Sequence, residues 1–276
     1  MKGTLFIVAT PIGNLDDITF RAVETLNSID IVLAEDTRHS KKLLKHLNIA
    51  KPIRAFHEHN EREKTKASIN ELHSGKSIAL ISDAGTPLIS DPGFSLVAKA
   101  KKEGLRVVPI PGASALIAAL SASGLASDSF TFLGFLPSKK TARIKLLKTL
   151  LYQTKTSIFY ESPKRILATL TDMHAIFGSS REVCLAKELT KVFETIRTDS
   201  IPNLIHYLNA DENNQKGEFV ILISANDKID VVDAESRLDS LLPMLCAEMG
   251  ASKAAKLAAK ITGVDKKICY KKAIDL

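Results

Sequence analysis

Residues 82–93, SDAGTPLISDPG, combine turn-forming residues with small polar side chains. Two glycines and two prolines restrict the backbone of this segment, while serine, threonine and aspartate side chains provide hydrogen-bonding groups. A stable fold alone does not require this composition, so we expect Asp83 to Pro87 to contact a ligand. The last residues have a structural explanation, because Asp91 followed by Pro92 is typical of a helix start.

Three other segments are candidates for the same site: TPIGN at 10–14, AEDTR at 34–38 and PGAS at 111–114. Each carries small polar or charged residues and follows a predicted strand. Ligands of open α/β sheets bind beyond the carboxyl ends of the strands, so we expect the four loops to surround one site. Neither GxGxxG nor a phosphate-loop pattern such as GxxxxGKS occurs, which argues against nicotinamide-dependent and nucleoside triphosphate-dependent enzymes.

The elements that position these loops alternate along the first 125 residues. Short β-branched runs predict strands at 4–9, 30–34, 52–56, 77–82 and 106–110. Helix signals lie between them: Asp16 or Asp17 as the first N-cap, Asn60 before a helix that ends at Gly75, and Asp91-Pro92 before a helix that ends at Gly104. The alternation predicts an N-terminal α/β domain at 1–125 with a mostly parallel sheet.

A second mixed α/β domain is predicted at 126–226. Its expected strands are 130–135, 156–162, 181–188 and 218–224, and its expected helices are 139–152, 163–177 and 199–209. A polar linker, DKIDVVDA at 227–234, leads to three short helices at 234–249, 252–262 and 265–274, the second with Ser252 as its N-cap. The region 234–276 is therefore expected to be a helix-turn-helix-like extension.

Most of the net charge of +7 lies in this extension, because residues 251–276 hold seven lysines and only two aspartates. A local basic block is typical of a nucleic-acid-binding arm, although a solvated helix face has the same composition. We predict that Lys253, Lys256, Lys260, Lys266 and Lys267 bind RNA phosphates.

The remaining composition excludes several other classes of protein. No apolar run is long enough to span a membrane and no signal-type cleavage region follows the N-terminus, so a soluble, cytoplasmic protein is expected. The three cysteines are far apart and have no metal-ligand spacing, so we expect neither a disulfide nor a metal site.

Nine motifs follow one another in order along the chain: VATPIGNLDDIT (8–19), VLAEDTR (32–38), HEHNE (57–61), SDAGTPLISDPG (82–93), PIPGASA (109–115), GFLP (134–137), ESPKR (161–165), KELTKVFE (187–194) and KGEF (216–219). This series closely resembles the ribosomal RNA small subunit methyltransferase I branch of the tetrapyrrole methylase superfamily. The resemblance covers residues 1–226 in order, and the final helices look like the C-terminal extension of that branch.

The resemblance implies a two-domain α/β class III methyltransferase fold, S-adenosyl-L-methionine as cofactor, and 2′-O-methylation of a cytidine ribose in the decoding region of 16S rRNA. It also implies a homodimer. The small ribosomal subunit or its 16S rRNA would be the partner. The residues implied to bind the cofactor are Pro11, Ile12, Gly13, Asp83, Ala84, Gly85, Thr86, Ile89, Ser114, Ala115, Tyr160, Leu189, Gly217 and Glu218.

The acceptor side of the reaction has two candidate segments. A ribose 2′-hydroxyl is a weak acid, so His57, Glu58 or His59 is a candidate proton acceptor, although Asn60 also makes this segment a helix start. Arg38 is a candidate phosphate clamp, with a buried structural ion pair to Asp36 as the alternative. By resemblance, Lys187 and Lys191 would also face the RNA backbone.

Two other functions fit parts of the same sequence. A related methyltransferase acting on a tetrapyrrole or another small molecule would share the fold. The TPIGN loop, the HEHNE segment and the basic tail argue against it, because the tetrapyrrole branch has a Gly-rich loop in place of TPIGN. A non-enzymatic RNA-binding assembly factor would have eroded cofactor loops, whereas these loops are intact.

Overall fold

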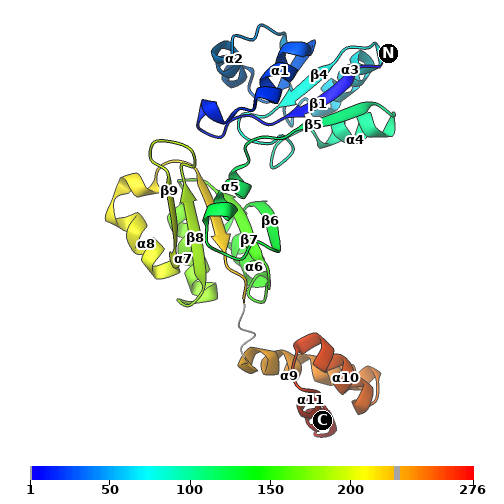
Figure 1. The fold of residues 1–276 in the computed structure, drawn as a ribbon. Coiled ribbons are helices and arrows are strands. Elements are labelled where there is room, and N and C mark those ends of the chain that lie inside the picture. The colour runs from blue at the N-terminus through cyan, green and yellow to red at the C-terminus, as the bar shows by residue number, and fades with distance from the viewer. Residues whose placement is uncertain (1, 227–230) are drawn as a thin grey trace. The chain divides into compact units, whose positions relative to one another are not determined.

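The computed structural model describes residues 2–226 and 231–276, with the side chains of 231–237 left out. The chain forms two compact units, one up to Ala225 and one from Asn226 onward. Figure 1 shows two sheets with their helices in the first unit and helices alone in the second. Part of the predicted linker, residues 227–230, lies outside the described residues.

The first sheet has five parallel strands in the order β3-β2-β4-β1-β5. Each strand is followed by a helix until the last strand leads out of the sheet. The elements are β1 (Thr4–Val8), α1 (Phe20–Ser28), β2 (Ile31–Ala34), α2 (Thr37–His46), β3 (Ile53–Ala55), α3 (Glu61–His73), β4 (Ile78–Ile81), α4 (Phe94–Lys102) and β5 (Arg106–Ile110).

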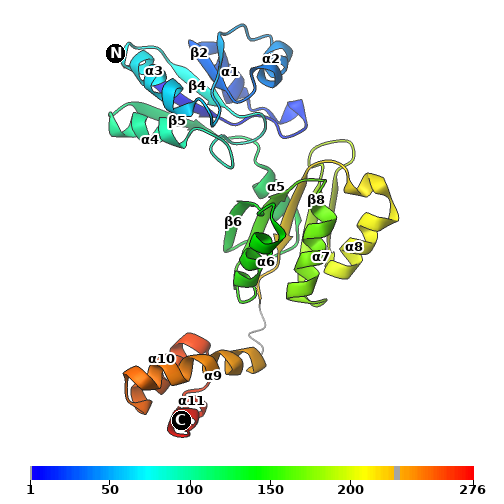
Figure 2. The same ribbon diagram turned by 180° about the vertical axis from the view of Figure 1, so that it is seen from behind.

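Alternate residues of these buried strands pack into two different cores. In β4, Ile78 and Leu80 contact the layer of α3 and α4, whereas Ala79 and Ile81 contact the layer of α1 and α2. This period of two is the expected consequence of side chains pointing to opposite faces of a strand. Figure 2 shows α3 and α4 lying together on one side of the sheet.

The second sheet is mixed, in the order β6-β7-β10-β8-β9, with only the β6–β7 pair parallel. One face is covered by α5 and the other by α6, α7 and α8. The elements are α5 (Ala115–Ala122), β6 (Phe130–Phe135), α6 (Lys140–Thr149), β7 (Thr156–Glu161), α7 (Ile166–Phe177), β8 (Glu182–Lys187), β9 (Thr195–Ser200), α8 (Ile201–Ala210) and β10 (Phe219–Ile223).

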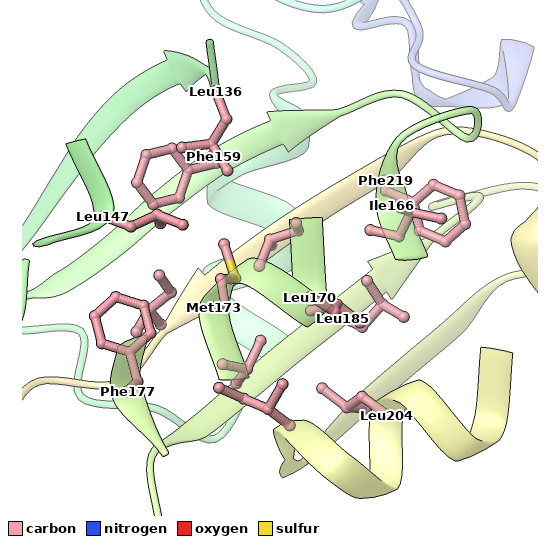
Figure 3. Packing of buried hydrophobic residues seen from close by; sticks show 14 of the residues in the cluster. Leu136, Leu147, Phe159, Ile166, Leu170, Met173, Phe177, Leu185, Leu204 and Phe219 are labelled. Carbon is pink, nitrogen blue, oxygen red and sulfur yellow. The ribbon is translucent and has the colours of Figure 1, made fainter. Parts of the chain in front are cut away.

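The larger core of this half lies between the sheet and α7. Figure 3 shows Leu170 and Met173 of α7 packed with Phe159 of β7 and Leu185 of β8. These four side chains are almost completely buried. Burial of such apolar side chains stabilises a fold by about 1.5–3 kcal/mol each, so this core is a main source of stability for the second sheet.

Three predicted details of the first unit are wrong. Thr19, and not Asp16 or Asp17, caps α1, because its side chain accepts from the amide of Ala22 while Asp16 and Asp17 lie in a preceding 3-10 turn. The helix expected at Asp91-Pro92 begins only at Phe94. The sequence predicts a loop and a helix start where β9 lies, since the polar sequence TIRTDS lacks the apolar signal of a buried strand.

The second unit consists of three helices, α9 (Val231–Glu248), α10 (Ala251–Thr262) and α11 (Lys266–Ile274). Its core joins Leu238 and Leu242 of α9 to alanines of α10 and to Cys269 of α11. Gly250 precedes α10, so Ser252 lies inside the helix and is not its cap. Among the residues described, no helix is long and apolar enough to cross a membrane.

Candidate functional site

The topology of the first sheet places its candidate loops at one point. β1 and β4 are neighbours, yet the chain leaves β1 toward α1 on one face and leaves β4 toward α4 on the other. Such a switch point opens a crevice beyond the carboxyl ends of the two strands, which is where open α/β sheets bind ligands. The segments 10–14 and 82–93 begin at this crevice.

A cavity of about 360 Å³ lies at this crevice, between the two sheets of the first unit. Its volume is in the range of pockets that hold small molecules. The side chains that line it come from the loops after β1, β2, β4 and β5 and from the second sheet. They belong to Ile12, Glu35, Asp83, Ala84, Gly85, Thr86, Ile89, Ser90, Asp91, Ser114, Ala115, Phe135, Tyr160, Leu189, Glu218, Phe219 and Val220.

Hydrogen bonds hold the floor of the cavity. The backbones of Thr10 and Gly85 exchange two hydrogen bonds, at 2.8 and 3.0 Å, and join the loop after β1 to the loop after β4. The hydroxyl of Thr86 donates to the carbonyl of Ala113 at 3.1 Å and adds the loop after β5. Leu88 and Ser90 have positive φ angles of 74° and 71°. Non-glycine residues with positive φ angles store backbone strain, which is typical of functional loops.

The opposite wall is formed by the loop after β8 and the start of β10. Lys191 donates to the carboxylates of Glu188 and Glu218, each at 2.9 Å. A Cβ at Gly13 would lie 2.5 Å from the Cγ of Lys191, and a Cβ at Gly217 would lie 2.5 Å from the Cγ of Glu188. These contacts require glycine at both positions, so neither residue needs to face the cavity to shape it.

Three carboxylates give the cavity an acidic side. Burial raises the pKa of Asp91 to about 6, with a smaller contribution from the nearby charge of Asp83 and a partial offset from the Ser82 hydroxyl. The pKa of Glu35 is raised as well, mainly by burial and then by repulsion from Asp91 and Asp83. One oxygen of Asp83 accepts the amide of Asp36 at 3.0 Å. The site therefore favours a cationic ligand, which would relieve this repulsion.

The other side of the cavity is apolar and aromatic. The ring of Tyr160 makes edge contacts with Phe132 and Phe135, at centroid distances of 4.9 and 5.6 Å. Burial raises the pKa of the Tyr160 phenol, so it remains a neutral hydroxyl. Ile12, Leu189 and Val220 complete an apolar surface. Such a wall suits a flat or aliphatic ligand part, next to an acidic side suited to positive charge.

Eleven of the fourteen residues predicted to bind a cofactor line the cavity. Pro11, Gly13 and Gly217 do not. Six further lining residues were not among the predicted site residues: Glu35, Ser90, Asp91, Phe135, Phe219 and Val220. Glu35, Ser90, Asp91, Phe135 and Phe219 lie within motifs already singled out, whereas Val220 lies in β10 just after the KGEF motif and carries no local sequence signal of a site.

The HEHNE segment lies away from this cavity lining, at the start of α3. The amide nitrogen of the Asn60 side chain lies 3.1 Å from Nε2 of His57, and its oxygen accepts the backbone amide of His57 at 2.9 Å. In this arrangement Nε2 of His57 is an acceptor and Nδ1 carries the proton. Glu58 and His59 are exposed. These residues therefore form a turn held by Asn60, outside the cavity.

Arg38 forms a two-point ion pair with Asp36, with distances of 3.1 and 2.8 Å. The pair is not buried as the structural alternative required, since the Arg38 side chain is 88% exposed. The arginine holds the pKa of Asp36 well below its usual range. Asp36 also caps α2 through the amide of Arg38. Arg38 thus lies on the surface beside Glu35 and remains accessible to a phosphate.

The predicted RNA-binding lysines fall into two groups. Lys187 is buried and donates to the carbonyl of Asn213 at 2.8 Å, and Lys191 is held between Glu188 and Glu218. Both ammonium groups stabilise the second domain, so the structure does not offer either to an RNA backbone. The lysines of the second unit are exposed on α10 and α11: Lys253, Lys256, Lys260, Lys266 and Lys267.

No group of three or more possible metal ligands is found in the part of the chain that the structure describes. The three cysteines, Cys184, Cys246 and Cys269, are free. The lining of the cavity offers carboxylates, hydroxyls and backbone groups.

Comparisons with known proteins agree with this architecture. The family model of Tetrapyrrole (Corrin/Porphyrin) Methylases matches residues 4–205, and that of the RsmI C-terminal HTH domain matches residues 231–276. A uroporphyrin-III-C-methyltransferase from Thermus thermophilus has a similar structure, with a TM-score of 0.58, 16% identity, and coverage of 81% of this chain and 94% of that one. Diphthine synthase is similar at a TM-score of 0.59, with 12% identity over 80% of this chain and 90% of that one. The fold is that of the class III methyltransferases of the tetrapyrrole methylase type.

Relatives with high sequence identity show to which family of this fold class the chain belongs. The ribosomal RNA small subunit methyltransferase I of Pseudomonas aeruginosa is 51% identical, covering 99% of this chain and 97% of that protein. The protein of the same name from Escherichia coli O157:H7 is 47% identical, covering 99% and 96%. The chain belongs to the ribosomal RNA small subunit methyltransferase I family of tetrapyrrole methylases.

Proposed function

We propose that this methyltransferase uses S-adenosyl-L-methionine to methylate the ribose 2′-hydroxyl of a cytidine in the decoding region of 16S rRNA. The observation that carries the donor assignment is the cavity at the β1/β4 switch point, which combines the carboxylates of Glu35, Asp83 and Asp91 with an apolar wall. The acceptor assignment rests on the names of the curated relatives and on the sequence motifs.

The lining of the cavity fits this donor. A sulfonium and an ammonium group make the methionine end of the donor cationic, and Asp83, Asp91 and Glu35 provide carboxylates for it. Ser114 stands at the start of α5, where free backbone amides favour the donor's carboxylate. Tyr160, Leu189 and Val220 provide surface for its adenosine part. When bound, the donor supplies an electrophilic methyl group.

The protein must align the acceptor oxygen with that methyl group and remove one proton. Asp91 is a better candidate for the proton acceptor than His57, Glu58 or His59. It lines the cavity, and its pKa of about 6 makes it ionised yet more basic than an exposed aspartate near neutral pH. His57 lies outside that lining, and its Nε2 lone pair is already used by Asn60. Arg38, on the surface next to Glu35, remains a candidate contact to an RNA phosphate.

Transfer of label from the donor to purified small ribosomal subunits, followed by mass spectrometry of the rRNA nucleosides, tests the proposal. The expected product is a 2′-O-methylcytidine in the decoding region. Label in a tetrapyrrole and none in RNA would favour the small-molecule alternative. Absence of donor binding at millimolar concentration in calorimetry would favour a non-enzymatic assembly factor.

A homodimer is part of the same proposal. Val192 and Phe193, in the loop beside Lys191, are 94% and 74% exposed in the single chain. Large apolar side chains exposed to this degree are typical of interaction surfaces. Sedimentation equilibrium should give twice the chain mass of 30.1 kDa. A monomer at micromolar concentration would contradict the proposed homodimer.

A further inference from the structure

The surface of α2 and the loop after it carries a concentration of positive charge that the overall composition hides. Residues 37–54 contain six lysines or arginines and no aspartate or glutamate. Lys41, Lys42 and Lys45 are exposed on α2, and Lys51 lies in the following loop. We call these four residues the α2 basic surface. None of them forms an ion pair with a carboxylate of the described residues.

The helix does not need this charge in order to pack. Its buried face consists of Ser40, Leu43 and Leu44, and the lysines lie on the opposite face. Lys45 is in the last turn and is favoured there by the helix dipole. Lys41 lies four residues before Lys45, and like charges at this spacing destabilise a helix by about 0.2–0.5 kcal/mol. The charge therefore has a cost that the fold alone does not explain.

A hollow with a volume of about 470 Å³ lies within this surface. Lys41, Lys45 and Lys51 line it together with apolar side chains, which include Leu44, Ile49 and Ile53. Ammonium groups around an apolar floor match the two parts of a nucleotide, because phosphate binds the cations and the base or sugar covers the aliphatic groups.

The backbone makes the rim of the hollow rigid. Asn48 follows α2 with a φ of 55°, and the amides of Asn48 and Ile49 donate to the carbonyls of Lys45 and Leu44. This pattern is a Schellman motif, which ends a helix with its last carbonyls satisfied. The last carbonyls of the helix are thus hydrogen-bonded within the turn, and Lys45 and Lys51 are held on either side of it.

The other end of α2 is connected to the cavity. Glu35 lines the cavity, and the next residue, Asp36, caps α2 and donates its amide to Asp83 at 3.0 Å. The helix has ten residues, which corresponds to a length of about 15 Å. A chain of phosphates bound along it would lead from the hollow toward the cavity, with exposed Arg38 at the near end.

We propose that the α2 basic surface binds the sugar–phosphate backbone of the RNA beside the nucleotide that is methylated. The inference rests on the proposed function and adds to it the position of an RNA contact outside the cavity and outside the C-terminal helices. Its occupant is RNA, because charge complementarity requires a polyanion and the hollow has the composition that a nucleotide requires.

The test compares two triple variants of the full chain. In the first, Lys41→Gln, Lys45→Gln and Lys51→Gln remove the three ammonium groups of the hollow. In the matched control, Lys101→Gln, Lys102→Gln and Lys148→Gln remove the same charge from exposed positions on α4 and α6. Both variants should bind the donor as the wild type does in calorimetry, which shows that the cavity and the fold are intact.

Binding of a 16S rRNA transcript is then measured against salt concentration. Each lost phosphate contact reduces the log–log salt slope by about 0.7–0.9, so the hollow variant should have a slope smaller by roughly 2 and an affinity lower by about tenfold or more at low salt. The control should keep the wild-type slope. Equal slopes for the two variants would overturn the inference while leaving the proposed function intact.

Two other outcomes identify different failures. If the hollow variant loses binding to assembled small subunits but not to the naked transcript, the surface contacts a protein and the inference is wrong. If the wild type neither binds nor methylates RNA, the proposed function itself fails. If the wild type methylates RNA and the hollow variant keeps the wild-type salt slope, the inference fails while the proposed function stands.

Discussion

The carboxylate of Glu61, in the first turn of α3, accepts the backbone amide of Gly93 at 3.2 Å, at the start of α4. The same oxygen accepts the amide of Ser95 at 3.0 Å. Glu61 thus performs the capping function that the sequence predicted for Asp91, from a position 32 residues before Gly93. Asp91 is left free to line the cavity. The end of the 82–93 loop is therefore fixed by a tertiary contact and its acidic residue serves the site.

Replacing Glu61 by Ala should destabilise the protein by about 1 kcal/mol, the usual cost of a lost helix cap. Urea denaturation should show a lower midpoint with an unchanged m-value. Asp91→Ala provides the comparison, because it removes a buried charge and, with Glu61 as the cap, no cap. A stability loss in Asp91→Ala that equals or exceeds the loss in Glu61→Ala would show that Asp91 caps the helix after all.

The pH dependence of methyl transfer should reflect the ionisation of Asp91. Its pKa is raised by burial to about 6, so the carboxylate that accepts the proton forms only as the pH rises through that value. When donor and RNA are both well below their KM values, the rate should increase between about pH 5 and 7, because under these conditions it reports the free enzyme. Asp91→Asn should lower kcat by about 10²-fold or more and remove the rise.

Asp83→Asn is the control for this experiment. Asp83 lines the same cavity and holds the amide of Asp36, so its replacement should raise the donor dissociation constant while the pH rise remains. The stability effect of Asp91 has the opposite sign to its effect on rate. Because its folded pKa lies above the unfolded value of 3.8, its contribution to stability falls as the pH rises from about 4 to 6. A wild-type rate without change from pH 5 to 7 would exclude Asp91 as the base.

Gly217 should be sensitive to substitution because of the Glu188 side chain. An added Cβ would meet Glu188 at 2.5 Å, at a φ of +98°. Gly217→Ala should displace Glu188 from Lys191 and from the amide of Glu218. Donor affinity should fall by about tenfold, equivalent to roughly 1.4 kcal/mol.

Gly124→Ala is matched to this variant in backbone strain. Gly124 has a φ of +72°, and nothing lies within 4 Å of an added Cβ. It should lose about 1 kcal/mol of stability or more from the positive φ, with donor affinity unchanged. If both variants bind the donor equally well, the loop around Glu188 has no part in forming the cavity.

The sequence predicted those parts of the molecule that depend on local patterns. The parallel strands of the first sheet have runs rich in β-branched residues, and the loops after β1, β4 and β5 carry their own turn residues. These local patterns were sufficient to predict where the site lies. β9 was missed because TIRTDS is an edge strand with a polar sequence. Its position depends on pairing with β8, which no local signal reveals.

Long-range contacts account for the other errors. The role of Asp91 depended on Glu61, and the burial of Lys187 depended on the carbonyl of Asn213. Lysine in a motif is compatible with both an RNA contact and an internal hydrogen bond, and only the tertiary structure distinguishes them. The basic character of 37–54 does not show in the net charge of the chain, because acidic residues elsewhere in the first unit balance it.

The exposed lysines of the second unit give a prediction that is independent of the α2 basic surface. Lys253, Lys256 and Lys260 lie at spacings of three and four residues on α10, so they project from one side of the helix. Their replacement by Gln should reduce the log–log salt slope of RNA binding by roughly 2, at about 0.7–0.9 for each phosphate contact. The buried alanines of α10 remain unchanged, so its contacts with α9 and α11 should persist and the circular dichroism spectrum should be that of the wild type.

A variant that combines the α10 substitutions with those of the α2 basic surface tests whether the two surfaces act separately. If they bind separate phosphates, the combined variant should lose the sum of the two reductions in slope. A combined loss no greater than either single loss would mean that both surfaces contact the same phosphates, and an unchanged slope in the α10 variant would show that its lysines are only a solvated helix face.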